Sequence, residues 1–131
     1  MHYALLIYLP EDVEKRVTPA QDQAVMEKCV ALAQETRKAG TYKGSARLEP
    51  TRTAVCVRNR EGGRQMITDG PFAETKEHMV GFYLIDVADL DAAKAYAQKL
   101  PTAELGATIE IRPILWQDPA MTLSTPLPPE L

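Results

Sequence analysis

The sequence is poor in the residues that build most catalytic and metal sites. Its 131 residues include two histidines, His2 and His78, and two serines, Ser45 and Ser124. The histidines are too few and too widely spaced for a histidine-rich metal site, and neither serine lies in a nucleophile elbow. No glycine-rich phosphate loop joins a strand to a helix, and no helix supplies an axial histidine for haem. The sequence therefore predicts no metal and no cofactor.

A dominant charge and a long hydrophobic run are also missing. Fifteen basic residues stand against 18 acidic ones, a net charge of -3, so no global field recruits nucleic acid or an anionic membrane. The apolar start, residues 3–9, has no basic segment before it and is too short to span a bilayer. We expect a cytoplasmic protein that binds neither nucleic acid nor membrane.

Two smaller features fit the same expectation. Cys29 and Cys56 lack C-x-x-C spacing and fall at apolar positions of the pattern, which favours reduced core residues over a disulfide or metal site. Residues 43–64 carry six basic side chains against Glu49 and Glu61. Long basic side chains at a hairpin edge also prevent aggregation, and we prefer that interpretation to nucleic-acid binding.

The pattern of apolar residues predicts strands and two helices. We expect strands at residues 2–9, 43–48, 53–59, 64–68, 79–87 and 107–116. A connector at 11–17 leads to a helix at 19–39, which begins with Thr18, Pro19 and Gln21 as a capping box. A second helix follows Asp89, with Leu90, Ala93, Ala97 and Leu100 facing inward. Residues 117–131 contain four prolines and should form a tail without a core of its own.

This order predicts an α+β fold in one domain, residues 1–116. It is the ferredoxin-like split β-α-β arrangement with an extra hairpin, an antiparallel sheet covered by helices on one face. The strands at 2–9 and 79–87 are apolar on both faces, so the second face also needs a cover. We therefore expect a homodimer.

The loop at residues 67–78 is the candidate functional segment. Asp69 and Gly70 favour a tight turn, Pro71 fixes the backbone after them, and Phe72 is expected to be buried as an anchor. Five titratable residues crowd into this loop: Asp69, Glu74, Lys76, Glu77 and His78. Such crowding produces either an acid or base with a shifted pKa, or a solvated loop with weak ion pairs.

The nine residues from Asp69 to Glu77, DGPFAETKE, resemble the signature of the DGPF group within the YCII-related family. Residues 3–8, 81–86 and 109–113 are similar to that family as well. The resemblance implies a dimeric α+β barrel over residues 1–116. In YCII-like relatives it implies a cleft with a His and Asp acid–base pair, the His on the first helix. This chain has no histidine between Thr18 and Gly40, so Asp69 is the counterpart of the acid, and His78 is the candidate substitute.

Together these features predict a homodimer with a small-molecule cleft at the loop, in which Asp69 and His78 are the catalytic candidates. The turn alternative has the Asp69 carboxylate accept backbone N–H groups instead. The resemblance to partners of extracytoplasmic-function sigma factors favours a second possibility, a non-catalytic ligand-binding or regulatory protein. A third is that the motif only fixes the loop or a dimer contact. The ligand-binding candidates are Gly70, Pro71, Phe72, Glu74, Lys76, Glu77, Tyr8, Tyr83 and Arg112.

Overall fold

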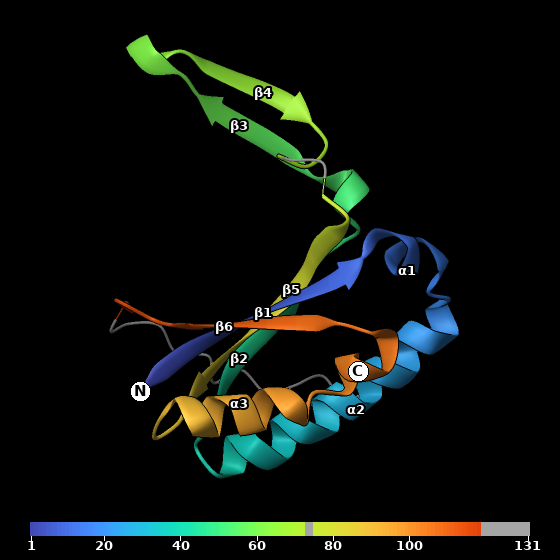
Figure 1. Ribbon diagram of the computed structural model, residues 1–131, viewed down its shortest axis with the longest axis vertical. Helices are drawn as coiled ribbons and strands as arrows, with labels where there is room; N and C mark the ends of the chain where they lie inside the picture. The colour runs from blue at the N-terminus through green and yellow to red at the C-terminus, as the bar shows by residue number, and fades with distance from the viewer. Residues whose placement is uncertain (73–74, 119–131) are drawn as a thin grey trace.

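The computed structural model describes residues 1–72 and 75–118, and the predicted tail therefore lies almost wholly outside the described residues. These residues form the expected α+β fold, with an antiparallel four-stranded sheet, three α-helices and a separate two-stranded hairpin (Figure 1). The described helices include none with the length and apolar character needed to cross a membrane. The strands are β1 His2–Pro10, β2 Tyr42–Arg47, β3 Val55–Asn59, β4 Gln65–Asp69, β5 Glu77–Asp86 and β6 Thr108–Pro113. The helices are α1 Glu11–Arg16, α2 Pro19–Lys38 and α3 Leu90–Gln98, with short 3-10 turns η1 Thr51–Thr53, η2 Glu61–Gly63 and η3 Pro101–Leu105.

The main sheet has the strand order β2-β5-β1-β6. β1 is central, antiparallel to β5 on one side and to β6 on the other. This is the ferredoxin-like order, and the β3–β4 hairpin is inserted between β2 and β5. Helices α2 and α3 cover one face of the sheet. The fold class predicted from the sequence is therefore confirmed.

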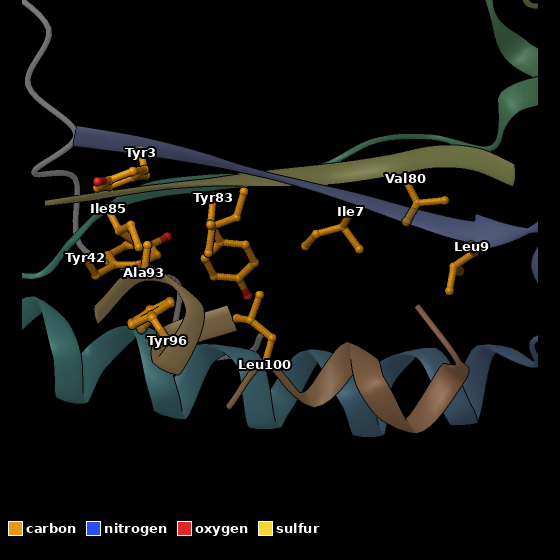
Figure 2. Packing of buried hydrophobic residues seen from close by; sticks show 12 residues of the cluster. Tyr3, Ile7, Leu9, Tyr42, Val80, Tyr83, Ile85, Ala93, Tyr96 and Leu100 are labelled. Carbon is orange, nitrogen blue, oxygen red and sulfur yellow. The ribbon is translucent and has the colours of Figure 1, made fainter. Parts of the chain in front are cut away.

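The core lies between that face and the helices. Leu5, Ile85 and Leu100 are almost completely buried there, and Figure 2 shows the buried side chains pointing from the strands toward the helix layer. Because side chains alternate along a strand, Leu6 and Tyr8 point to the opposite face from Leu5 and Ile7. Leu6 and Tyr8 are half-buried on that face.

The helix ends follow the local sequence closely. Thr18 accepts a hydrogen bond from the backbone of Gln21 at 3.1 Å, and the Gln21 side chain accepts one from the Thr18 backbone at 2.9 Å. This is the predicted capping box. Asp89 caps α3 by accepting a hydrogen bond from the Ala92 backbone at 2.9 Å. The prediction that Leu90 faces inward is wrong: it lies in the first turn and is exposed, while Tyr96 is buried in the core.

The connector predicted at residues 11–17 is a helix instead. α1 begins directly after Pro10, which ends β1. Its first turn is acidic and its last turn is basic, an order that suits the helix dipole. Two ion pairs at i,i+4 spacing, Lys15 with Glu11 and Arg16 with Asp12, add to its stability. The sequence therefore contained a helix signal that the apolar pattern did not reveal.

The β3–β4 hairpin projects away from the main sheet (Figure 1). We call residues 55–69, which include β3, η2 and β4, the arm. The prediction that Phe72 is buried is wrong, because its ring is 75% exposed. The arm turns away before the loop, so no core lies beneath the ring, which instead sits 5.8 Å from the Arg58 guanidinium. Cys56, also expected in the core, is half-buried in the arm, whereas Cys29 is buried as expected.

Candidate functional site

A hollow of about 740 Å³ lies where α1, η1, the residues after β4 and the beginning of β5 meet. Its walls carry an unusual density of charge for so small a space. Among the described residues, no three His, Cys, Asp or Glu side chains gather in a way that would hold a metal ion. The titratable residues that line the hollow are Glu11, Glu14, Lys15, Arg52, Asp69, Lys76 and His78.

The path of the chain at the end of β1 brings α1 to this place. In the β1–β5 pair, Leu9 lies opposite His78. The next residues turn into α1, and the Glu11 backbone donates a hydrogen bond to the Lys76 carbonyl at 2.7 Å. The first turn of α1 is thereby fixed against the start of β5. One turn further along, Glu14 faces His78.

Glu14 and His78 form the best-defined contact in the hollow. Nδ1 of His78 lies 2.5 Å from Oε2 of Glu14. The side chain of His78 is 13% exposed and that of Glu14 is 12% exposed. Thr51 holds the carboxylate from the other side, because its backbone donates to Oε1 at 2.9 Å and its hydroxyl to Oε2 at 3.3 Å. The carboxylate is therefore fixed by two other segments.

The protonation of this pair follows from these contacts. Burial raises the pKa of Glu14, but the hydrogen bonds from the Thr51 backbone and from His78 outweigh it and hold the pKa below its ordinary value of 4.5. Glu14 is therefore ionised at neutral pH and can only accept hydrogen bonds. A neutral His78 must then carry its proton on Nδ1, which leaves Nε2 with a lone pair. A histidine held in this way suits proton transfer.

The remaining charges of the hollow divide into paired and unpaired groups. Glu11 and Lys15 pair with each other at 2.9 Å. Arg52, Lys76 and Asp69 have no side-chain hydrogen bond or ion pair in the part of the chain that the structure describes. The unpaired charges are therefore two cations and one carboxylate, which favours a ligand with a negative charge and a hydrogen-bond donor.

Four of the predicted site residues come together in this hollow: Asp69, Pro71, Lys76 and His78. Gly70 has a positive φ of 90° and donates its backbone N–H to the Ala54 carbonyl at 2.7 Å, so it forms the turn at the base of the arm. Among the described residues, the Asp69 carboxylate accepts no hydrogen bond from a backbone N–H of the loop. The hydrogen bonds that its alternative role as a turn residue requires are therefore absent from the described part of the loop.

The other predicted site residues lie elsewhere or cannot be placed. Glu77 and the exposed Phe72 are near the hollow in sequence but do not line it. Glu74 lies outside the described residues. Arg112 is on β6 opposite Ala4, on the other side of β1.

The two tyrosines among the ligand-binding candidates, Tyr8 and Tyr83, do not line the hollow either. Tyr8 lies on the sheet face away from the helices, with its hydroxyl 3.5 Å from Glu110. Tyr83 is buried in the core, with ring contacts to Tyr42 and Tyr96 (Figure 2). Because the core residues of a strand alternate, Tyr83 shares the helix-facing side with Ile85.

Sequence reasoning missed the half of the site that α1 and η1 supply. Glu14 and Thr51 were not among the candidates, and neither was Arg52. The signal that could have found Glu14 is the charge pattern of α1, with acids first and bases four residues later. No comparable signal marks Thr51, because its contact with Glu14 spans 37 residues of sequence.

Comparison with known proteins identifies the family. The model of the YCII-related domain matches residues 1–117. The chain belongs to the YCII-related family. A similar protein is the uncharacterized protein R00369 of Rhizobium meliloti (strain 1021), 39% identical over 120 residues, which cover 91% of this chain and 96% of that protein. Membership of the DGPF group stays a prediction.

The site of this YCII-related protein differs from the pair that the resemblance implied. Its first long helix, α2, contains no histidine. Instead, the short helix α1 supplies the carboxylate, Glu14, and β5 supplies the imidazole, His78. The two side chains are 64 residues apart in sequence. Asp69 lines the same hollow from the end of β4.

Proposed function

We propose that this protein binds a small anionic molecule in the hollow beside α1 and exchanges a proton with it through Nε2 of His78. The contact between His78 and Glu14 carries the proposal. It supports a fixed tautomer and a fixed ring orientation, which are the two properties that a general base needs. Glu14 is the positioning residue, and Thr51 in turn holds Glu14.

The unpaired charges support the choice of ligand. Arg52 and Lys76 would attract a carboxylate or phosphate group, since neither is neutralised by another described side chain. Asp69 would accept a hydrogen bond from a hydroxyl or amine of the same ligand, or serve as a second acid–base group. Pro71 stiffens the loop after Asp69 because its φ is fixed.

The tautomer is the first test. The protein has two histidines, so His2→Gln leaves His78 as the single imidazole for ¹⁵N NMR. His2 contacts Asp86 at the opposite end of β1 and is outside the hollow. We expect the neutral ring of His78 to be protonated at Nδ1 in this variant and to lose that preference when Glu14→Gln is added. A neutral ring protonated at Nε2 would contradict the proposal.

Ligand binding is the second test. Inorganic phosphate and a panel of short mono- and dicarboxylates are added to the protein, and thermal unfolding is followed. A ligand at about one hundred times its Kd adds roughly 2.7 kcal/mol to the free energy of unfolding. We expect the double variant Arg52→Ala, Lys76→Ala to lose this stabilisation. Arg112→Ala, which removes an exposed cation outside the hollow, should retain it.

A non-catalytic role is the alternative use of the same hollow. In that case the ligand binds but no proton is transferred, and the protein acts as a ligand-binding or regulatory partner of an extracytoplasmic-function sigma factor. The two functions separate in His78→Gln. If the protein transfers a proton to its ligand, His78→Gln should bind the ligand as the wild type does but lose hydrogen–deuterium exchange at an acidic C–H of that ligand. If the protein only binds the ligand, the wild type itself shows no such exchange.

We also propose that the protein forms a homodimer in the cytoplasm. The support is the sheet face opposite the helices, where Ala4, Leu6, Phe82 and Leu84 are apolar and half-buried. No described helix covers that face. Exposed apolar faces of this kind mark contact surfaces. Light scattering at micromolar concentration tests the state, and the mass of a single chain would contradict it.

A further inference from the structure

The arm is a two-stranded ribbon, and each of its strands has one edge without a paired strand among the described residues. β3 and β4 pair only with each other, in a sheet separate from the main one. In Figure 1 the arm extends away from the four-stranded sheet and its helices. An isolated two-stranded hairpin is only marginally stable in water, and a third strand adds stability. The arm therefore offers a template for one more strand.

The backbone hydrogen bonds of the arm show which groups of β3 point to its free edge. Gly70 donates to the Ala54 carbonyl at 2.7 Å before the strand, and Arg60 donates to the Arg64 carbonyl at 2.8 Å after it. Residues that bond to the neighbouring strand alternate with residues that point away from it. Even-numbered residues of β3 therefore bond to β4. The residues whose backbone N–H and C=O groups point outward, without a hydrogen bond to any described residue, are Val55, Val57 and Asn59.

The two faces of β3 carry different chemistry. Side chains alternate along a strand, so Val55 and Val57 share one face, where they are 61% and 56% exposed. Arg58 and Arg60, the residue after the strand, lie on the other face and are exposed. Neither arginine forms an ion pair with a described carboxylate, and the Arg58 guanidinium lies over the Phe72 ring instead. A strand added beside β3 meets apolar side chains on one face and two unpaired cations on the other.

The edge of β4 has a less uniform character. Its apolar residue Ile67 lies on the same face as Asp69, and the opposite face has one cation next to the strand, Arg64. A carboxylate on the added strand would meet repulsion from Asp69. β3 contains no acidic residue. The edge of β3 is therefore the better site for an acidic partner.

The charge of β3 selects the occupant, because neighbouring strands place their side chains beside each other on both faces. Acidic residues at every second position pair with Arg58 and Arg60. The apolar residues between them pack on Val55 and Val57. A second copy fits poorly, since pairing β3 with the β3 of another copy brings the arginines of both copies together on one face, where like charges repel.

We propose that the free edge of β3 binds an extended segment of a partner protein in which acidic and apolar residues alternate. The segment becomes the third strand of the arm. Its hydrogen bonds to the outward backbone groups of β3 provide affinity, and its alternating side chains provide specificity. This interaction is separate from the hollow at the base of the arm and does not rest on the function proposed for the hollow.

A synthetic peptide tests the chemistry of the partner. The probe is a short blocked peptide of alternating valine and glutamate with a fluorescent label. One control has lysine in place of glutamate, and the other has methylated valine N–H groups, which removes the backbone donors that face β3. Fluorescence anisotropy should show binding of the glutamate peptide, and binding at least about tenfold weaker for each control, a loss of about 1.4 kcal/mol. No binding, or equal binding of the glutamate and lysine peptides, would overturn the proposal.

A charge reversal in the protein gives the matched experiment. Arg58→Glu combined with Arg60→Glu should reverse the preference, so that this variant binds the lysine peptide more tightly than the glutamate peptide. Arg112→Glu changes an exposed cation on β6, outside the arm, and should keep the wild-type preference. The same preference in both variants would contradict the proposed site.

NMR locates the added strand. On addition of the glutamate peptide, the amide of Val57 should become protected from hydrogen exchange, whereas that of Ile67 on β4 should not. Protection of Ile67 alone, or of the main sheet alone, would place the peptide elsewhere and overturn the proposal. Protection of Val57 in the protein without peptide, lost on dilution, would mean that a second copy occupies the edge and would overturn it as well.

Discussion

The main sheet and the arm are built from the same alternating strand pattern, yet they bury it to opposite extents. Leu5 and Ile85 are fully buried, whereas Val57 and Ile67 are more than half exposed. Their residue types do not explain the difference. Helices α2 and α3 lie against one face of the main sheet, and no described helix lies against the arm. Alternation thus predicts which side chains share a face, while the surroundings decide whether that face is buried.

The largest expected effect is in the core of the main sheet. Leu5→Ala should lower the free energy of unfolding by about 2 to 5 kcal/mol, because it opens a cavity where neighbours cannot collapse. Leu115→Ala is the control with the same change in side chain, since Leu115 is fully exposed; we expect less than about 0.5 kcal/mol. Urea unfolding measures both. Equal costs in the two variants would show that the core is not where we place it.

A close backbone approach gives the next largest effect. A Cβ atom at Gly81 would lie 2.6 Å from the Ala46 carbonyl oxygen on the neighbouring strand β2. Gly81→Ala should therefore force β2 and β5 apart and cost about 1 to 3 kcal/mol, as overpacking usually does. Denaturant unfolding and the dispersion of amide NMR signals along β2 would report it. An unchanged denaturant midpoint would mean that β2 moves away from the added methyl group at no cost in stability.

The stability that Glu14 contributes at the hollow should depend on pH. The hydrogen bonds to Glu14 keep its folded pKa below 4.5. A lowered pKa adds stability that is fully present above the unfolded value and is lost as pH falls through the folded value. Glu14→Gln should cost about 1 kcal/mol at pH 7. The difference from wild type should shrink below about pH 4.5 in thermal melts at successive pH values, and a difference that stays constant down to pH 2 would contradict this.

The smallest effect is expected at Phe72, beside the arm. Its exposed ring contacts Arg58 alone among the described aromatic and cationic side chains. Phe72→Ala should change the free energy of unfolding by less than about 0.5 kcal/mol, since an exposed cation–π contact adds little. A loss above about 2 kcal/mol in the chemical denaturation of the wild-type assembly would show that a second copy or a ligand buries the ring.

The sequence predicted much of the main sheet because its signals are local. The capping box at Thr18 and the cap at Asp89 depend on neighbours three residues away. The split β-α-β order follows from the succession of strands and helices. The last strand was predicted too long, at 107–116 instead of Thr108–Pro113, because apolar residues continue past its end; Leu115 and Trp116 are exposed.

The candidate site was only half predictable. Asp69, Pro71, Lys76 and His78 lie within ten residues of one another, so the sequence presents them as one loop. The pattern of apolar residues could not predict Glu14, because α1 has no buried residue and thus no apolar stripe. Its charge pattern indicates a helix but not the direction in which that helix turns after Pro10.

By itself, therefore, the sequence determined the strands, the helices α2 and α3, their order, and which side chains of each strand share a face. Those features arise from hydrogen bonds and side-chain alternation between residues close together in the chain. Only the tertiary structure decided that Glu14 meets His78 and that the arm leaves its own sheet. Both depend on how distant segments are placed in space, and a contact across 64 residues is fixed by strand pairing and the turn at Pro10 rather than by any local pattern.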